Sequence, residues 1–332
     1  MNFETAFPNF RHKEQNQGDE KINQKFSITI PKLFCTILII LICFKSGSFS
    51  LSNERERNPQ QQIRIPEIST PKTEHKIDVG GRKLHCCVYG KDSPTVVLVS
   101  GFGAPQAYWN SVIPKLAAKT TVVTYDRAGI GKSEINDLPT HGEQSAKDLH
   151  FLLKKLDVPK PYILVGHSYG GSVVRLFASI YPEEMGGLIL EDAQHEDVLN
   201  EQLKILGGKD LEALKQAVAR FSTPENPKTE ADYRNITREQ VRKSKPLPQI
   251  HFVVLTAGDR SKAMPPIFSE EGKEKIAKLG LELQKKLVAL IHGGKHIVVE
   301  GVGHNIHFEK SEALINPVVE MINEVRKGKT EK

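Results

Sequence analysis

The stretch Tyr162-Ile163-Leu164-Val165-Gly166-His167-Ser168-Tyr169-Gly170-Gly171 contains the pattern Gly-x-Ser-x-Gly. Apolar residues precede the pattern and small residues follow it, which predicts a buried strand, a sharp turn and a helix. Glycine at 166 and 170 removes side chains that would collide where the strand folds back onto the helix. Ser168 then takes strained backbone angles of the kind found at functional sites, above a helix N-terminus that favours negative charge. Ser168 is therefore the candidate nucleophile; the alternative is a glycine-rich turn with an idle serine.

The pattern on both sides of this turn alternates between strands and helices. Continuous apolar runs, typical of strands buried on both faces, cover 95–99, 121–125, 162–165, 187–190, 250–255 and 296–299. Helical stretches separate them near 106–118, 142–156, 170–181, 274–291 and 311–326. A hairpin over 75–79 and 82–89, turned by Gly80-Gly81, precedes the first run. This order predicts the α/β class, with a mostly parallel central sheet and helices on both of its faces.

One segment interrupts the alternation. Residues 194–249 form charged helical pieces with proline-containing joints such as Pro246-Leu247-Pro248. We interpret them as a helical insertion above the strand ends, which would make them a lid. The folded domain, lid included, is predicted over 75–328.

The first 74 residues are expected to lie outside this fold. Residues 1–27 form a polar tail, 28–45 a hydrophobic segment and 46–74 a linker rich in Ser, Asn, Gln and Pro. The run 28–44 carries only Lys32 as a charge, so it is at the short limit for a bilayer-spanning helix. Its apolar centre also fits a cleaved secretory signal. We expect a membrane-anchored or exported protein, with possible attachment through 28–44; the choice between anchor and signal stays open.

The composition excludes some classes of partner. The formal net charge of +6 is spread thinly over 332 residues, and no block of Lys and Arg is interleaved with aromatic residues. The sequence therefore gives no support to nucleic-acid binding. The four cysteines have no metal-binding or disulfide-framework spacing.

Together these segments resemble the α/β-hydrolase fold family, in particular its esterase-like serine hydrolases, over about residues 75–328. The stretch 97–103, Val-Leu-Val-Ser-Gly-Phe-Gly, is similar to the oxyanion loop of the family, with Ser100 where many members have histidine. The resemblance implies that the backbone N–H groups of Phe102 and Tyr169 form the oxyanion hole. The stretch 125–133 is similar to the turn after the family's fourth strand, and we interpret it as scaffold.

The resemblance also indicates where the general base and its acid should lie. His304 follows the last predicted strand on a glycine-flanked loop, whereas His307 is interpreted as a structural or rim residue. The acid should come between serine and histidine in chain order. Asp259 follows the seventh strand, at the usual location of the family, and is the expected acid. Asp192, after the sixth strand, is the alternative.

These residues predict a serine hydrolase that cleaves an ester or related acyl bond of a small-molecule substrate, without a cofactor or metal. Serine at the turn argues against dehalogenases and epoxide hydrolases, for which the resemblance would require aspartate. A non-catalytic receptor or binding protein on the same scaffold is the alternative, and an interaction module based on residues 1–74 is a third hypothesis. A zinc site built from His292, His296, His304 and His307 is disfavoured, because His296 opens a strand and so does not share a helix face with His292. A phosphate loop ending at 131–133 is also disfavoured, because it would need glycine where Asp126 stands.

Overall fold

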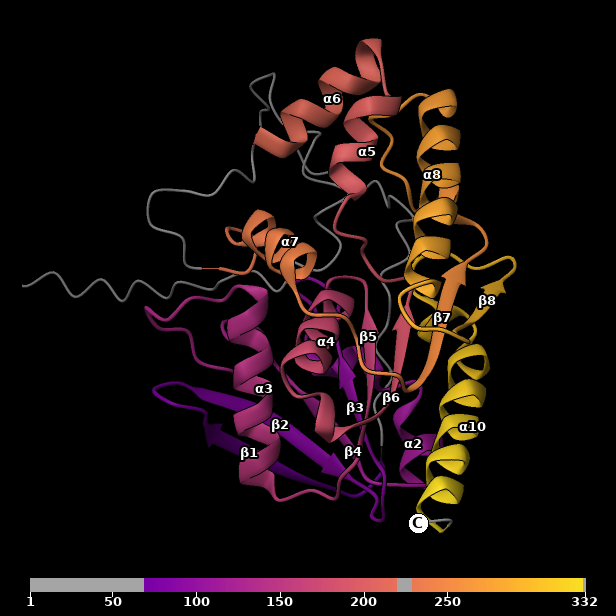
Figure 1. Cartoon of the computed structure of the whole chain (residues 1–332). Helices are drawn as coiled ribbons and strands as arrows, with labels where there is room; N and C mark the ends of the chain where they lie inside the picture. Colours follow the sequence, from indigo (N-terminus) through magenta and orange to yellow (C-terminus); the bar gives the residue numbers. More distant parts are fainter. Residues whose placement is uncertain (1–68, 220–228, 331–332) are drawn as a thin grey trace, which may run out of the picture. The chain divides into compact units, whose positions relative to one another are not determined.

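The computed structural model describes residues 69–219 and 229–330, and Figure 1 shows their arrangement. The predicted tail, the hydrophobic segment over 28–45 and most of the linker lie outside these described residues. Within the described ranges, no helix combines the length and apolar character that crossing a bilayer requires.

An eight-stranded sheet forms the centre of the described chain, in the order β1-β2-β4-β3-β5-β6-β7-β8. The strands are β1 (Lys72–Asp78), β2 (Lys83–Tyr89), β3 (Thr95–Val99), β4 (Val122–Tyr125), β5 (Tyr162–His167), β6 (Met185–Glu191), β7 (His251–Ala257) and β8 (Lys295–Val299). The pairs β1–β2 and β2–β4 are antiparallel, and every other pair is parallel. The expected hairpin and mostly parallel sheet are therefore confirmed.

Alternate residues of the central strands face two separate apolar cores. In β3, Val97 and Val99 belong to one core while Val96 and Leu98 belong to the other. The period of two in side-chain direction means that a strand buried on both faces needs apolar residues throughout. The first core is covered by α3 (Gly142–Leu156), α4 (Tyr169–Ile180) and part of α8 (Glu270–Val288). The second is covered by η1 (Gln106–Trp109), α2 (Ile113–Ala117), α9 (Ile306–Glu309) and α10 (Ser311–Thr330).

The expected helices near 106–118 and 274–291 differ most from the observed ones, and α10 continues beyond the expected end at 326 to Thr330. The single helical stretch over 106–118 is wrong: it divides into η1 and α2, with Pro114 in the first turn of α2, where its missing N–H costs no helical hydrogen bond. Helix α8 begins before 274, because the Ser269 side chain accepts a hydrogen bond from the Gly272 N–H at 3.0 Å and caps the helix at Glu270. Two short 3-10 turns, η2 (Pro182–Glu184) and η3 (Arg260–Ala263), complete the connections.

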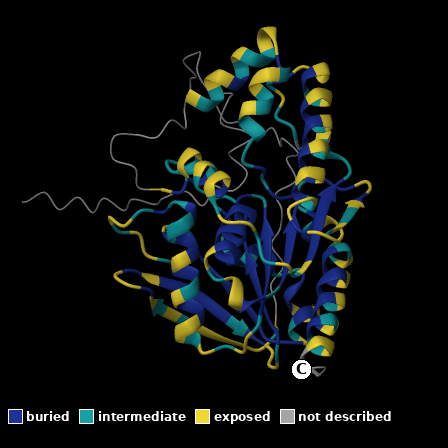
Figure 2. Ribbon diagram, viewed as in Figure 1, coloured by how far each residue is buried: buried dark blue, intermediate teal, exposed yellow. Residues whose placement is uncertain are grey.

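The predicted insertion contains α5 (Val198–Ile205), α6 (Gly208–Ala219) and α7 (Arg234–Lys243). Its small apolar cluster, which includes Leu206 and Leu214, packs with Phe268 and Ile276 and is separate from both sheet cores. Figure 2 shows the contrast: the strands from β2 to β7 are mostly buried, while α5, α6 and α7 are mostly intermediate or exposed. Residues that line one cavity come both from these helices and from the ends of the strands. We call residues 194–249 the lid.

Candidate active site

Ser168 lies on the turn between β5 and α4, in the conformation that the sequence predicts. Its φ of 51° and ψ of −117° are strained for a residue with a side chain. The turn is fixed by two hydrogen bonds: the Ser168 N–H donates to the Glu191 carbonyl at 3.1 Å, and the Gln194 N–H donates to the Ser168 carbonyl at 3.0 Å. The backbone around the serine is therefore held by the neighbouring strand β6.

The two glycines of the motif are required by close contacts. A Cβ atom at Gly170 would lie 2.2 Å from the Val99 carbonyl oxygen, and one at Gly166 would lie 2.5 Å from a methyl carbon of Val174. Neither separation is sterically allowed, so any side chain here would displace the strand–turn–helix unit. The glycines thus serve the function assigned to them from the sequence.

The histidine beside this turn is His304, which follows β8. Its Nδ1 lies 2.6 Å from Oδ2 of Asp192, the residue directly after β6. Since a carboxylate accepts hydrogen bonds, Nδ1 is the protonated nitrogen, and Nε2 of the neutral imidazole carries the free lone pair. Ser168, Asp192 and His304 all lie beyond the carboxyl ends of parallel strands, the edge at which open α/β sheets bind ligands.

Asp192 is buried, with its side chain 2% exposed. Burial alone would raise its pKa, but the hydrogen bond with His304, the charge of Arg260 and the Ala257 N–H together hold its pKa below the ordinary value. Arg260 pairs with Oδ1, the oxygen that His304 does not use. Asp192 is therefore an ionised acceptor that orients His304.

Asp259, the acid expected from the sequence, is not the partner of His304 in this structure. Its Oδ1 accepts a hydrogen bond from the Ser261 hydroxyl at 3.1 Å, and its N–H donates to the Val302 carbonyl. The residue next to it, Arg260, reaches back to Asp192 instead. The pairing with His304 is made by the alternative acid, so the predicted pairing with Asp259 is wrong for this geometry.

A cavity of about 340 Å³ brings the remaining candidates together. Ser168 and His304 both line it, as do Asp192 and the two oxyanion candidates Phe102 and Tyr169. Among the described residues no hydrogen bond joins the Ser168 hydroxyl to His304; such bonds are often long before substrate binds. Tyr169 is the first residue of α4, where a helix has no internal acceptor for its N–H. The arrangement can support nucleophilic attack, proton transfer and stabilisation of an oxyanion.

The oxyanion loop is held by a buried ion pair that sequence reasoning missed. Arg127 donates to the Ser100 and Gly101 carbonyls at 2.6 and 2.7 Å, and its Nε lies 2.8 Å from Oε2 of Glu230. Glu230 in turn accepts a hydrogen bond from the Gly103 N–H at 2.5 Å. Burial would lower the pKa of Arg127, but the Glu230 carboxylate more than offsets this and raises it. Glu230 belongs to the irregular part of the lid, where no periodicity marks it.

The role of His167, the residue before Ser168, was also missed. Its Nε2 lies 3.0 Å from the His304 carbonyl oxygen, so it donates a hydrogen bond to the backbone of the general-base candidate. Burial, together with the charges of His304 and His307, lowers the pKa of His167 to about 3. A neutral His167 thus fixes the His304 loop. Its place within the Gly-x-Ser-x-Gly pattern was the available signal.

The disfavoured metal and phosphate hypotheses gain no support. His307 pairs with Glu191 and His296 with Thr256, and among the described residues neither forms a group of potential metal ligands with His304. The Lys132 N–H, which a phosphate loop would present to its ligand, donates to the Asp126 carboxylate at 3.0 Å.

A separate cluster has the donor set of a metal site. The ligand atoms of Glu74, His85 and Cys87 lie within 4.8 Å of one another. However, Glu74 is neutralised by Lys72 and Lys132, and the two ring nitrogens of His85 contact Glu74 and Asp126. The contacts of these side chains are therefore explained by their protein partners.

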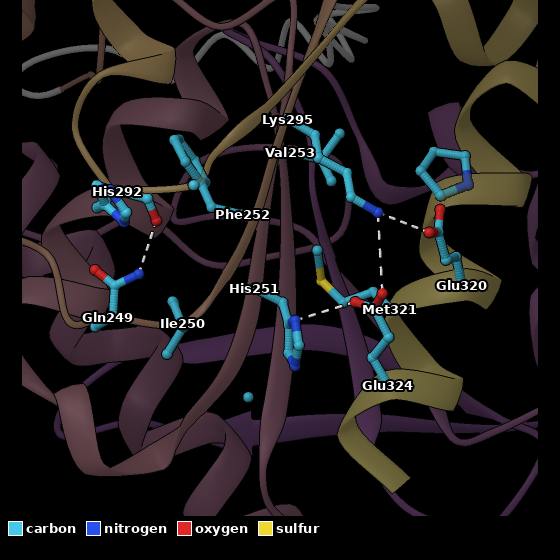
Figure 3. A pocket seen from close by; sticks show the side chains of 13 residues that line it. Gln249, Ile250, His251, Phe252, Val253, His292, Lys295, Glu320, Met321 and Glu324 are labelled. Carbon is cyan, nitrogen blue, oxygen red and sulfur yellow. Dashed lines mark hydrogen bonds and ion pairs between the residues drawn. The ribbon is translucent and has the colours of Figure 1, made fainter. Parts of the chain in front are cut away.

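Another hollow lies at the opposite end of the sheet, where β7 and β8 begin. Figure 3 shows its lining, in which His251 pairs with Glu324 at 3.0 Å and Lys295 with Glu320 at 2.7 Å. None of the candidate site residues lines it. The candidate catalytic residues therefore belong to the cavity that Ser168 lines and not to this hollow.

Comparisons with known proteins agree with the fold. A family model described as the alpha/beta hydrolase fold matches residues 94–250. An uncharacterized protein YqjL of Bacillus subtilis is 26% identical over 221 residues, which cover 67% of this chain and 80% of that protein. A soluble epoxide hydrolase of Corynebacterium sp. is 34% identical over 113 residues, covering 33% of this chain and 38% of the relative.

Solved structures show the same likeness. A putative lipase of Acinetobacter baumannii superposes with a TM-score of 0.56 at 18% identity, covering 77% of this chain and 93% of that one. A thermophilic esterase of Thermogutta terrifontis gives a TM-score of 0.54 at 19% identity, covering 77% and 99%. With its sheet order, its serine on the turn after β5 and the family-model match over residues 94–250, the chain has the α/β-hydrolase fold.

Proposed function

We propose that this chain is a serine hydrolase that cleaves an ester or related acyl bond through Ser168, His304 and Asp192. The observation that carries the proposal is the 2.6 Å contact between His304 Nδ1 and Asp192 Oδ2 at the cavity that Ser168 lines. A carboxylate that orients an imidazole beside a strained, accessible serine is the arrangement that acyl transfer needs.

In the proposed reaction, the Ser168 hydroxyl attacks the substrate carbonyl while His304 Nε2 takes its proton. The N–H groups of Phe102 and Tyr169 stabilise the resulting oxyanion, and losing one such donor costs about 10²–10³ in rate. When the tetrahedral intermediate collapses, the bond to the leaving alcohol breaks and His304 returns the proton to that alcohol. Water, activated by His304, then attacks the acyl-serine and releases the acid.

A serine nucleophile favours hydrolysis of an acyl bond over hydrolysis of an epoxide, the activity for which one relative is named. A hydroxyl that attacks an epoxide would leave an ether, which water does not readily cleave, whereas an acyl-serine ester is hydrolysed in the same site. Residue 168 on the turn after β5 is a serine and not a carboxylate, which supports acyl transfer over epoxide opening.

A fluorophosphonate probe tests the proposal. We expect a covalent adduct on Ser168 of the folded chain, no adduct on Ser168→Ala, and hydrolysis of short-chain p-nitrophenyl esters by the unmodified chain only. An unlabelled chain, or labelling that survives Ser168→Ala, would contradict the proposal and favour a binding protein on the same scaffold.

A further inference from the structure

The lid helix α7 presents arginine side chains to the Ser168 cavity. One side of α7 is anchored on the core: Thr237 Oγ1 accepts from the Gly142 N–H at 2.8 Å and lies 3.2 Å from the Tyr169 hydroxyl. Arg234 and Arg238 lie one turn apart on α7, and both line the cavity. The guanidinium of Arg234 also lies over the ring of Phe102, 5.4 Å from its centre. Two cationic groups therefore reach the space in which the reaction is proposed to occur.

Arg238 is partly buried, and its partners differ from those of four other arginines of the fold. Arg82, Arg127, Arg175 and Arg260 each form an ion pair with an Asp or Glu. Within the described residues Arg238 makes no ion pair; it donates to the Asn235 side chain at 2.9 Å, and its buried Nε has no hydrogen-bond partner. Burial, and then the like charges of Arg234 and Arg242, lower its pKa to about 10. A partly buried guanidinium without a carboxylate partner has a desolvation cost that no ion pair offsets, and a bound anion would relieve this cost.

Asp192 supplies the only carboxylate among the described residues that line the cavity. Its two oxygens are already taken by His304 and Arg260. Much of the remaining lining is apolar, including Leu199, Leu214, Val218, Ile267, Phe268 and Ile276. The space beside Ser168 thus combines a positive charge with an apolar wall.

We infer that Arg238 binds an anionic group of the substrate, a carboxylate or a phosphate, so that the substrate is an acyl ester with an apolar body and a negative charge. The inference rests on the proposed function and adds the substrate class. A guanidinium binds either anion through two parallel N–H bonds, and Arg234, one turn away on the same helix, adds to the positive potential.

The test compares two esters that differ only in charge. The p-nitrophenyl monoester of suberic acid carries a free carboxylate, and its methyl ester is the neutral match. For the full chain we expect kcat/KM to be at least about tenfold higher for the anionic ester. Arg238→Gln should lower the ratio of the two kcat/KM values by about 10–100-fold, as expected for a hydrogen bond to a charged group, mainly through KM.

Two further variants separate charge recognition from damage to the lid. Arg242, the next arginine of α7, pairs with Asp197 and Glu239 and does not line the cavity, so Arg242→Gln should leave the ratio unchanged. Arg238→Lys keeps the positive charge but lacks the two parallel N–H donors of a guanidinium, so it should retain part of the preference for the anionic ester. Because both esters are measured on the same sample, partial unfolding cancels in the ratio.

Inhibition of neutral-ester hydrolysis by octanoate, octyl phosphate and octanol distinguishes the two anions. We expect octanoate, octyl phosphate or both to inhibit more strongly than octanol. The difference in inhibition between these anions and octanol should be smaller in Arg238→Gln. Two results would overturn the inference: the ratio of the two kcat/KM values is the same in Arg238→Gln as in the unmodified chain, or it falls equally in Arg242→Gln. If the neutral ester is still hydrolysed in these experiments, the proposed hydrolase function is not affected. Failure to turn over either ester, with no fluorophosphonate adduct, would instead overturn the proposed function.

Discussion

Two histidine–carboxylate pairs lie next to each other where β6 ends and the chain after β8 passes over it. In one pair His304 Nδ1 is 2.6 Å from Asp192, and in the other His307 Nδ1 is 2.7 Å from Glu191. The side chain of His304 is 34% exposed, whereas that of His307 is 1% exposed. The ring of His307 packs against Trp109, with ring centres 4.6 Å apart. An imidazole and a carboxylate at nearly the same distance therefore occupy very different surroundings in the two pairs.

Accessibility to solvent, and not the hydrogen bond, therefore distinguishes the candidate catalytic pair from the structural pair. Glu191 Oε1 accepts from both the His307 N–H and its ring, so it ties the chain after β8 to the end of β6. His304 lies three residues before His307, which makes these two hydrogen bonds. We infer that the buried pair fixes the backbone from which His304 reaches the cavity, while only the exposed pair can exchange a proton with a substrate.

The largest expected effect is the loss of activity when the pair of His304 and Asp192 is changed. Asp192→Asn should lower kcat for ester hydrolysis by about 10⁴, because an amide no longer enforces the tautomer with the proton on Nδ1 of His304. Asp259→Asn is the matched control, since Asp259 does not bond to His304, and its kcat should stay near that of the unmodified chain. Steady-state kinetics on one neutral ester measures both, and the reverse order of the two losses would contradict the assignment of Asp192.

The buried pair should affect stability more than chemistry. Glu191→Leu removes the acceptor of two hydrogen bonds from His307, and breaking a buried pair costs about 3 kcal/mol of the free energy of unfolding. Urea unfolding measures this loss. The exposed Glu282 on α8 supplies the control, because Glu282→Leu should change stability by no more than about 0.5 kcal/mol. Equal losses in the two variants would mean that the buried pair does not support the fold.

The acid sensitivity of folding should depend on His167. In the folded chain burial keeps its pKa at about 3, below the ordinary value of 6.5, so the unfolded state binds more protons between these pH values. The free energy of unfolding must therefore fall as the pH is lowered through this window, by about 2 kcal/mol at pH 5 from this residue.

Urea unfolding at pH 7, 6 and 5 tests this dependence. Between pH 7 and pH 5, the free energy of unfolding of His167→Asn should fall by about 2 kcal/mol less than that of the unmodified chain. The control is substitution of the exposed His292 by Asn, which should leave the fall unchanged. If both variants keep the full loss, His167 is not the group responsible.

Much of the fold could be predicted because buried strands and amphipathic helices have local signals. The run at 95–99 coincides with β3, and the stretch at 142–156 with α3, whose first turn is capped by the His141 side chain. The turn at Ser168 was equally clear, because only glycine fits at 166 and 170. These elements are determined by residues that are close in the sequence.

The acid of the site could not be decided in this way. Asp192 and Asp259 both follow a buried strand, and the choice depends on which carboxylate faces His304 after folding. A φ of 40° at Asp192 helps to set the direction of its side chain, and no pattern in the sequence marks that angle. The Arg127–Glu230 pair was missed for a related reason, because its members are separated by 103 positions and one of them lies in the lid.

That ion pair has a consequence for how this enzyme scaffold can change. A carboxylate from the lid holds the loop that is proposed to bind the oxyanion, so the part of the chain that would choose substrates also shapes the catalytic apparatus. Grafting a foreign lid onto this sheet would therefore alter turnover as well as selectivity unless an acidic residue returned to the position of Glu230. Diversification of the lid is constrained at that position even where the rest of the insertion is free to vary.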